Sequence, residues 1–368
     1  MIDPILFLKL CKDNGFNTFY GVPDSTLKHF CTAATEDPDL QHTICVNEGA
    51  AIGAAIGCHL STSSVPVVYM QNSGLGNAVN PLTSLVAEEV YSIPMLLVIG
   101  WRGEPGVKDE PQHAFQGVIT PSMLDNLHID YATVDKDTDI ETELLNAKNF
   151  LKDNDRPYAL LVKKGAFSTY AAKPETRKEY PLSRQRAIEY LVQAQTADNV
   201  IIATTGMASR ELFHIRKEKG IPHGTDFLTV GGMGHASSIA LGVAANAPNK
   251  KVICLDGDGA CLMHLGALAT IGSSGITNLL HIVINNGEHG STGGQPTVSR
   301  KIDLCAIAKA CGYSKAVRVE SKEELITYLK DVQGLCFLEI ITNNHKSSKI
   351  GRPTSTPQEN KKMFMENF

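Results

Sequence analysis

Several features that would assign the chain to common protein classes are missing from its sequence. Only 20% of its 368 residues are charged, the formal net charge is −5, and no run of Lys or Arg occurs, so nucleic acid and anionic membranes are not expected partners. The opening segment MIDPILFLKLCKDNGF is too short and too charged for a signal peptide or a membrane span. The nine cysteines are scattered without a CxxC pair, which is typical of reduced, buried thiols. We therefore expect a soluble cytoplasmic protein.

A dinucleotide fingerprint is also missing, since no GxGxxG follows the first expected strand of either half, and this argues against a nicotinamide enzyme. The sequence does contain two rounds of alternating strand and helix patterns. Continuous apolar runs such as PMLLVIGW are typical of parallel strands buried on both faces. We predict an α/β protein with two open parallel sheets, in residues 1–168 and 186–368, joined by a polar, proline-containing linker at 169–185.

Two expected strand ends in the second half carry oxygen ligands. Asp258 directly follows the apolar run VICLD, and Asn285 and Asn286 end the next apolar run along the chain. Parallel sheets bind ligands at the carboxyl ends of their strands, so we expect these side chains to converge. Gly257 and Gly259 are expected to allow a tight turn and a close approach of a ligand. Each motif alone is common in turns, but a carboxylate and an amide oxygen at neighbouring strand ends indicate a Mg²⁺ site completed by phosphate oxygens and water.

The pair GDG and NN, with one helix and one strand between them, resembles the diphosphate–magnesium motif of thiamine-diphosphate-dependent enzymes. The resemblance implies a pyrimidine-binding domain at 1–168, a diphosphate-binding domain at 186–368 and no central third domain. It also implies a site built across the interface of a homodimer or a dimer of dimers, with thiamine diphosphate and Mg²⁺ as cofactors. The implied metal ligands are Asp258, the Asn286 side chain, with Asn285 as the alternative, and the Glu288 carbonyl. The implied diphosphate-side contacts are Gly257, Asp258, Gly259, Ala260, Asn286, Glu288 and His289.

A second mark of this family is a glutamate after the second strand of the first domain, which here is Glu48 in CVNEGAAIG. Its carboxyl group has to protonate N1′ of the aminopyrimidine, so that the exocyclic amine becomes the base that removes the thiazolium C2 proton. Taken alone, Glu48 fits equally well as a helix N-terminal residue interacting with the helix dipole. Together with the GDG and NN motifs it indicates a catalytic carboxyl.

Two further segments resemble cofactor-binding loops of the family. In VGGMGHASS, Met233 corresponds to the large apolar residue beneath the bent cofactor and Gly232 lies beside the pyrimidine, although a methionine here could equally fill a gap in the core. NSGLGNAVN resembles the pyrimidine-side loop, with Asn72, Gly74 and Asn77 as contacts. For the two asparagines, a helix N-cap is the alternative.

The segments FYGVPDSTL, GWRGEPGVKDEPQH and NNGEHGSTGGQPT resemble the members of this family that decarboxylate phosphonopyruvate. The resemblance implies non-oxidative conversion of 3-phosphonopyruvate to phosphonoacetaldehyde and CO₂ through the thiamine diphosphate ylide, in phosphonate biosynthesis. Decarboxylation of sulfopyruvate is the alternative, and carboligation is less favoured because carboligases usually keep a central domain. A carrier that only stores the cofactor would not need Glu48.

The proton transfers and the substrate charges require further residues. Candidate proton donors and acceptors are Asp24, Ser25, His113 and His289, because histidine titrates near neutral pH and related decarboxylases keep polar residues in the corresponding loops. A carboxylate and a phosphonate require cationic partners. Candidates, which the sequence does not rank, are Arg102, Lys108, Arg300 and Arg352. The loop GWRGEPGVKDE is rich in glycine and charge and is a candidate lid.

Overall fold

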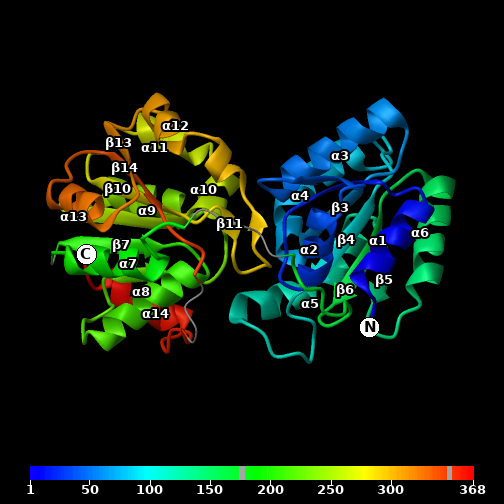
Figure 1. Ribbon diagram of the computed structural model, residues 1–368, viewed down its shortest axis with the longest axis horizontal. Helices are drawn as coiled ribbons and strands as arrows, with labels where there is room; N and C mark the ends of the chain where they lie inside the picture. Colours follow the sequence, from blue (N-terminus) through cyan, green and yellow to red (C-terminus); the bar gives the residue numbers. More distant parts are fainter. Residues whose placement is uncertain (174–178, 197, 346–349) are drawn as a thin grey trace. The chain divides into compact units, whose positions relative to one another are not determined.

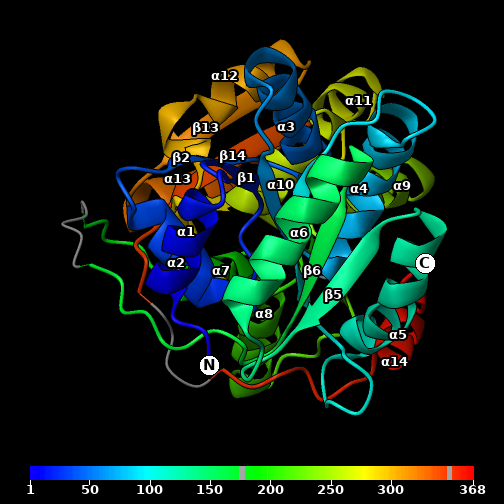
Figure 2. The ribbon, with the colours of Figure 1, turned by 90° about the vertical axis from the view of Figure 1, so that its right-hand side faces the viewer.

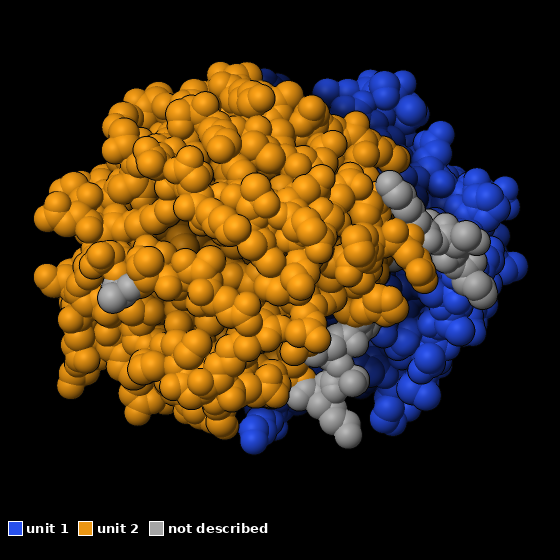
Figure 3. All heavy atoms as spheres, turned by 60° about the vertical axis from the view of Figure 1, so that its left-hand side comes forward, with its two compact units in different colours: residues 1–175, 289–295 blue, residues 176–288, 296–368 orange. Residues whose placement is uncertain are grey.

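The computed structural model describes residues 1–173, 179–196, 198–345 and 350–368, and the chain separates into two compact units (Figure 1 and Figure 3). Each unit has its own six-stranded sheet and its own hydrophobic core. No helix in the described ranges combines the length and the apolar character that a membrane crossing requires. Unit 1 comprises Met1–Glu175 and His289–Gln295, and unit 2 comprises Thr176–Glu288 and Pro296–Phe368.

Unit 1 contains a parallel sheet with strand order β2-β1-β3-β4-β6-β5. Figures 1 and 2 show helix α6 beside the β5–β6 edge of this sheet. The strands are β1 (Thr18–Gly21), β2 (Gln41–Ile44), β3 (Val67–Gln71), β4 (Leu96–Trp101), β5 (Asp130–Val134) and β6 (Tyr158–Lys163). The helices are α1 (Pro4–Asp13), α2 (Lys28–Glu36), α3 (Glu48–Thr62), α4 (Leu75–Pro81), α5 (Pro111–Asn126) and α6 (Ile140–Asn154), with short turns η1 (Asn72–Gly74) and η2 (Leu82–Val86).

The sheet of unit 1 is buried on both faces. Alternate residues of β3 enter two different cores: Val67 and Tyr69 pack with residues of α1, α2 and α6, whereas Val68 and Met70 pack with residues of α3 and α4. Because side chains alternate across a strand, this division requires an uninterrupted apolar run, as the sequence has. Unit 1 is therefore a helix–sheet–helix sandwich with an apolar core on each face of its sheet.

Unit 2 repeats this architecture. Its parallel sheet has the order β13-β14-β10-β9-β7-β8, formed by β7 (Asn199–Ala203), β8 (Asp226–Leu228), β9 (Lys251–Gly257), β10 (Leu279–Asn285), β13 (Lys315–Val319) and β14 (Cys336–Ile341). Its helices are α7 (Arg184–Gln193), α8 (Met207–Glu218), α9 (Ala236–Asn246), α10 (Asp258–Met263), α11 (Ala267–Ser273), α12 (Leu304–Ala310), α13 (Lys322–Lys330) and α14 (Pro357–Met365). A two-stranded ribbon of β11 (Glu288–His289) and β12 (Gln295–Pro296) and a short turn η3 (Val298–Lys301) complete the elements.

Read from the opposite edge, the second sheet has the order β8-β7-β9-β10-β14-β13, which is the topology of the first sheet. In each unit the chain leaves the first strand toward one edge and then returns to that strand's other side. This reversal lies between β1 and β3 in unit 1 and between β7 and β9 in unit 2. Open α/β sheets bind ligands at such switch points, outside the carboxyl ends of the strands. The predicted fold class, two open parallel sheets, is confirmed.

The predicted linker, residues 169–185, contributes to both units. The Tyr170 hydroxyl donates to Glu36 Oε2 at 2.9 Å in unit 1, whereas Leu182 packs in the core of unit 2. Helix α7 then begins at Arg184, inside the predicted linker.

The segment His289–Gln295 differs from the expected domain boundaries, which placed it in the second domain. Its contacts group it with unit 1, where Gln295 Nε2 donates to Thr32 Oγ1 at 3.2 Å. Gly293, whose φ is 137°, lies beside the same threonine, where a Cβ would be 3.1 Å from its hydroxyl. A loop far along the chain therefore joins the first unit through tertiary contacts.

Candidate active site

Glu48 lies at the switch point of unit 1. Asn47 caps α3 by accepting the Ala50 amide at 2.8 Å, so Glu48 is the first residue of the helix, and it is only 5% exposed. Asn77 Nδ2 donates to Glu48 Oε2 at 2.7 Å. Gly74 lies against the same carboxyl group, because an added Cβ would be 2.4 Å from Oε1. The predicted residues Glu48, Gly74 and Asn77 are thus brought together, from two segments well separated in the sequence.

Asn72 has a different environment from the other predicted residues of its loop. Its Nδ2 donates to the Arg102 carbonyl and to Thr120 Oγ1, both at 2.9 Å, and its Oδ1 accepts the Arg102 amide at 3.1 Å. Both of its donor hydrogens are used within unit 1. Asn72 therefore fixes the chain at the end of β4, where the predicted lid begins.

Asp24 lies just past β1 and is almost completely buried. Its Oδ2 accepts the amides of Thr26 and Leu27 at 3.0 Å each, whereas Oδ1 has no hydrogen bond among the described residues. Burial raises the pKa of Asp24 to about 6, although the backbone amides and Arg102 oppose the shift. Gly100 makes room for it, because a Cβ there would lie 2.0 Å from Asp24 Oδ2. A carboxyl with this pKa can exchange a proton near neutral pH.

The cation nearest to this region is Arg102, which is hydrogen-bonded to Ser25. Arg102 donates to both carboxylate oxygens of Asp109, at 2.7 and 2.5 Å, and to Ser25 Oγ at 2.7 Å. These hydrogen bonds from Arg102 hold the pKa of Asp109 well below its usual range. Three of the five guanidinium N–H donors are used, which leaves two for a ligand. Asp109 is a partner of Arg102 that the sequence analysis did not identify, although its position in VKDEPQH was available as a signal.

His113 lies in the first turn of α5 and is half-buried. Burial, together with the nearby Arg102 charge, lowers its pKa, which favours the neutral imidazole. Its Nδ1 is closed to solvent and has no hydrogen-bond partner in the described part of the chain. The turn is held close to β4 because Gly103, with φ of 71°, packs directly on the His113 carbonyl. Asp24, Ser25, Arg102 and His113 therefore belong to one neighbourhood, consistent with the roles predicted for them.

Asp258 is the first residue of α10, at the switch point of unit 2, and is 3% exposed. Its Oδ2 accepts the hydroxyls of Thr297 and Ser299 at 2.6 and 2.8 Å. Burial raises its pKa despite these bonds. The two hydroxyl residues, which the sequence analysis missed, come from a turn that carries no recognisable motif.

The backbone conformation of Gly257 differs from the one predicted. The prediction that Gly257 makes a tight turn is wrong, because its φ of −113° is accessible to any amino acid. An added Cβ would meet nothing within 4 Å. The chain's own packing therefore does not demand glycine, and the open space is consistent with the predicted approach of a ligand.

The two asparagines at the end of β10 are clearly distinguished. Asn285 is completely buried, donates to Glu339 Oε1 at 2.7 Å and accepts the Gly287 amide, and its Oδ1 lies 2.9 Å from the Ser299 hydroxyl, which shares its one hydrogen between Asn285 and Asp258. Asn286 is half-buried, and its Oδ1 accepts only a long, 3.3 Å bond from the Glu288 amide. The Asn285 side chain is thus committed to the fold, and Asn286 is the one with oxygen capacity left for a metal.

The other predicted cofactor contacts lie in separate segments of the chain. Met233 is half-buried in the turn before α9, beside Gly232, whose φ is 61°. Burial lowers the pKa of His289 to about 4, so its imidazole is neutral. Ala260 is buried in α10, and the Glu288 carboxylate accepts Asn344 Nδ2 at 3.0 Å.

Among the other cationic candidates, Arg300 is already engaged in unit 2. It donates to the carbonyls of Asn285 and Thr342 at 2.9 and 3.1 Å and stacks 4.5 Å from the Tyr180 ring. Anion binding by Arg300 would disturb these contacts. Lys108 and Arg352 are exposed.

The pattern of two α/β units with these motifs agrees with comparisons to known proteins. Residues 5–127 match the family model for the thiamine pyrophosphate enzyme, N-terminal TPP binding domain, and residues 204–340 match that for the C-terminal TPP binding domain. The two matches together cover most of the chain. The chain belongs to the thiamine pyrophosphate enzyme family, which confirms the predicted family.

Within this family the chain is similar to two curated enzymes from Streptomyces over nearly its whole length. It is 34% identical to the phosphonopyruvate decarboxylase of Streptomyces viridochromogenes, covering 95% of this chain and 91% of the relative. It is 32% identical to that of Streptomyces hygroscopicus, covering 96% and 90%. The sulfopyruvate decarboxylase of Methanosarcina acetivorans is 30% identical, covering 98% and 96%.

The close approach of Gly74 to Glu48 can be tested with a matched pair of glycines. Gly74→Ala should displace the Glu48 carboxyl and lower thiamine-dependent turnover by about 100-fold, the effect expected from an ångström-scale misplacement. Gly76→Ala, two residues on, meets no atom within 4 Å and should retain nearly full activity. Steady-state kinetics, with urea unfolding to verify folding, would measure both. Equal activities of the two variants would show that Glu48 does not depend on this contact.

The environment of Asp24 predicts a pH-dependent stability. Since the folded-state pKa is about 6 and the ordinary value is 3.8, the folded protein binds a proton that the unfolded chain releases across this window. Stability is therefore lost as pH rises through the window. Asp24→Asn should be more stable than the wild type by up to ~2 kcal/mol at about pH 8, with the difference vanishing below about pH 4. Urea unfolding over this pH range would measure it.

The exposed Asp153→Asn provides the control, because a surface substitution of this kind should change stability little at any pH. A destabilised Asp24→Asn variant at about pH 8 would contradict the inferred cost of ionising Asp24.

Proposed function

We propose that the protein is a thiamine-diphosphate- and magnesium-dependent decarboxylase of 2-oxo acids that converts 3-phosphonopyruvate to phosphonoacetaldehyde and CO₂. The main support is the match to two phosphonopyruvate decarboxylases over at least 95% of this chain. The buried Glu48 carboxyl at the switch point of unit 1 supports a catalytic role rather than simple cofactor storage. A second candidate is sulfopyruvate decarboxylation, which the relative from Methanosarcina acetivorans favours.

The residues of unit 2 fit the diphosphate end of the cofactor. Mg²⁺ prefers oxygen ligands and keeps several positions for phosphate and water. Asp258 is a buried carboxylate whose hydrogen-bond donors on Oδ2 are neutral hydroxyls, so a cation would compensate its charge. We propose that Asp258, the Asn286 side chain and the Glu288 carbonyl hold Mg²⁺. The proposed diphosphate contacts are Gly257, Gly259, Ala260 and His289.

The residues of unit 1 fit the reacting end. Thiamine diphosphate, when bound, supplies the nucleophilic carbon and the electron sink for loss of CO₂. Asn77 holds one oxygen of Glu48, so the other can carry the proton for N1′ of the pyrimidine. Asp24, with a pKa of about 6 and an unpartnered Oδ1, can give a proton to the substrate carbon and take one from its hydroxyl. The neutral His113 is a further proton acceptor.

Arg102 is the cation best placed to bind the substrate anion. It lies between Ser25 and Asp109 and keeps two N–H donors available, whereas Lys108 is exposed and Arg300 is engaged elsewhere. Its guanidinium plane can bind a carboxylate or a phosphonate through two hydrogen bonds. The Arg102–Asp109 pair closes the base of the loop at 100–110, which we propose acts as a lid.

A homodimer, or a dimer of dimers, is proposed as the working form. Glu48 belongs to unit 1 and Asp258 to unit 2, so each unit carries only one end of the cofactor site. Helix α3 presents Gly53 and Gly57 where an added Cβ meets nothing, and Leu60 on it is 71% exposed. Such a surface of small and apolar residues allows another chain to pack closely.

The substrate can be established with parallel assays of aldehyde release. Purified protein with Mg²⁺ and thiamine diphosphate should process phosphonopyruvate with a kcat/KM at least about tenfold above that for sulfopyruvate, and should discriminate more strongly against pyruvate, which lacks the second anion. Glu48→Gln should lower kcat by about 10²–10⁴-fold while cofactor binding persists. A preference for sulfopyruvate would establish the second candidate. Normal turnover by Glu48→Gln would contradict the proposed mechanism.

The metal ligand at the end of β10 can be identified by comparing two alanine variants. Asn286→Ala should weaken Mg²⁺ activation by at least about tenfold with little effect on folding. Asn285→Ala should instead lower the free energy of unfolding by about 1–3 kcal/mol, because it leaves buried partners of Asn285 unsatisfied. Mg²⁺ titrations and urea unfolding of both variants would measure this. The reverse pattern would make Asn285 the ligand.

A further inference from the structure

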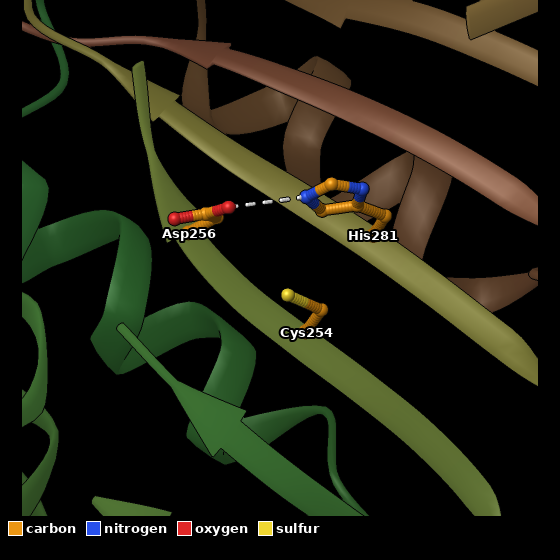
Figure 4. A group of neighbouring side chains, drawn as sticks. All are labelled: Cys254, Asp256 and His281. Carbon is orange, nitrogen blue, oxygen red and sulfur yellow. Dashed lines mark ion pairs between the residues drawn. The ribbon is translucent and has the colours of Figure 1, made fainter. Parts of the chain in front are cut away.

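Three side chains with metal-ligating atoms meet inside the sheet of unit 2 (Figure 4). Cys254 and Asp256 are two residues apart on β9 and so point to the same face, and His281 on β10 is the cross-strand partner of Cys254. The thiol, carboxylate and imidazole ligand atoms lie within 4.8 Å of one another. All three side chains are at most 1% exposed. None of them has a role in the function proposed above.

Two buried polar atoms of this cluster face each other in a charge contact, drawn as a dashed line in Figure 4, that is not a hydrogen bond. Asp256 Oδ2 and His281 Nε2 are 3.5 Å apart, yet neither forms a hydrogen bond within the described residues. The other atom of each group is occupied: Gly257 donates its amide to Asp256 Oδ1 at 2.9 Å, and the Tyr313 hydroxyl lies 3.2 Å from His281 Nδ1. Buried polar atoms in native proteins are normally satisfied, so two that converge in this way indicate a missing partner between them.

The Tyr313 contact bears on which imidazole nitrogen is available, because the hydroxyl can either accept from Nδ1–H or donate to Nδ1. When Nδ1–H donates to the tyrosine oxygen, His281 Nε2 directs a bare lone pair toward the Asp256 carboxylate. In that tautomer two lone pairs oppose each other unless a proton or a metal cation lies between them. Metal-bound histidines are usually oriented by a hydrogen bond of this kind from their second nitrogen. Figure 4 shows the Cys254 sulfur on the same side as the Asp256–His281 pair.

We infer that Cys254, Asp256 and His281 bind a zinc-class divalent transition-metal ion. Thiolate, imidazole and carboxylate together are ligands that Zn²⁺ accepts, whereas Mg²⁺ requires oxygen. Ligand atoms about 2.0–2.3 Å from a tetrahedral ion are roughly 3.3–3.8 Å apart. The 3.5 Å separation of Asp256 Oδ2 from His281 Nε2 lies in this range.

The charges of the ligands and of the inferred ion also cancel in the core of unit 2. As the sulfur–metal bond forms, the Cys254 thiol releases its proton to solvent and becomes a thiolate. One thiolate and one carboxylate then neutralise a divalent ion, so the buried group carries no net charge.

The ion is structural rather than catalytic. Because the three side chains are closed to solvent, it is taken up as unit 2 folds and is retained afterwards. Asp256 lies two residues before Asp258 and accepts the Gly257 amide. The ion would therefore stabilise the end of β9, directly before Asp258, the proposed Mg²⁺ ligand.

Metal analysis of the intact protein tests this inference. Protein produced with Zn²⁺ in the medium and then dialysed against excess Mg²⁺ should retain about one zinc ion per chain. Cys254→Ser and His281→Gln should each lower the zinc content at least about tenfold. Wild-type protein refolded with Co²⁺ should also show a thiolate-to-cobalt charge-transfer band, a measurement that remains valid if the variants fail to fold.

Two controls separate this site from other metal binding. Cys31→Ser removes an equally buried thiol in unit 1 and should keep the zinc. Asp258→Asn alters the proposed Mg²⁺ site and should keep it as well. The inference would be overturned by wild-type protein that retains no zinc and shows no cobalt–thiolate band, or by a Cys254→Ser variant that retains the full zinc content.

Discussion

The site depends on carboxylates that the fold buries without neutralising them. Glu211, Asp226 and Glu339 are almost completely buried, and each forms an ion pair with an arginine. Asp24, Glu48 and Asp258 are as deeply buried, but their bonds come from backbone amides, an asparagine and two hydroxyls. An arginine beside a buried carboxylate supplies a compensating positive charge, although burial still raises the pKa of Asp226 to about 6, whereas a carboxylate held by neutral donors lacks that charge and can accept a cation. This division separates the supporting framework from the residues proposed to do chemistry.

The parallel sheets explain where these carboxylates lie. Because both faces of each sheet are covered by helices, most strand residues are apolar, and the carboxylates proposed to act lie just past the strand ends. Both units repeat one topology, and each has its switch point between its first and third strands. Each unit thus has a switch point at the equivalent place in its sheet. Glu48 and Asp24 lie near that of unit 1, and Asp258 lies near that of unit 2. The Cys254–Asp256–His281 cluster also puts polar groups within strands, as does Glu339 of β14, but Glu339 is paired with Arg318 and the cluster requires a separate explanation.

Close backbone approach is the second requirement of unit 1. Gly74 and Gly100 have no side chains where Glu48 and Asp24 lie, and Gly103 brings the first turn of α5 against β4. A side chain at Gly74 or Gly100 would occupy the space that the Glu48 or Asp24 carboxyl fills. Arg102 and Asp109 then fasten the loop that follows β4, so the proposed anion-binding group and the proposed proton-transfer groups belong to one rigid neighbourhood.

The sequence by itself determined the fold class, the family and most of the strands, because buried parallel strands need continuous apolar runs and the GDG, NN and Glu48 motifs have a characteristic spacing. It did not reveal the edge strands β5, β8 and β13, whose exposure is mixed or whose length is short. The resemblance favoured Asn286 over Asn285, and the tertiary structure adds the physical reason, because Asn285 ends β10 with its side chain held by buried partners while Asn286 lies just past the strand. The tertiary structure alone supplied Thr297, Ser299 and Asp109 as partners of predicted residues, and it placed His289–Gln295 with unit 1. Apart from the Arg102–Asp109 pair, which lies within one loop, these contacts join residues far apart in the chain, and no local pattern encodes them.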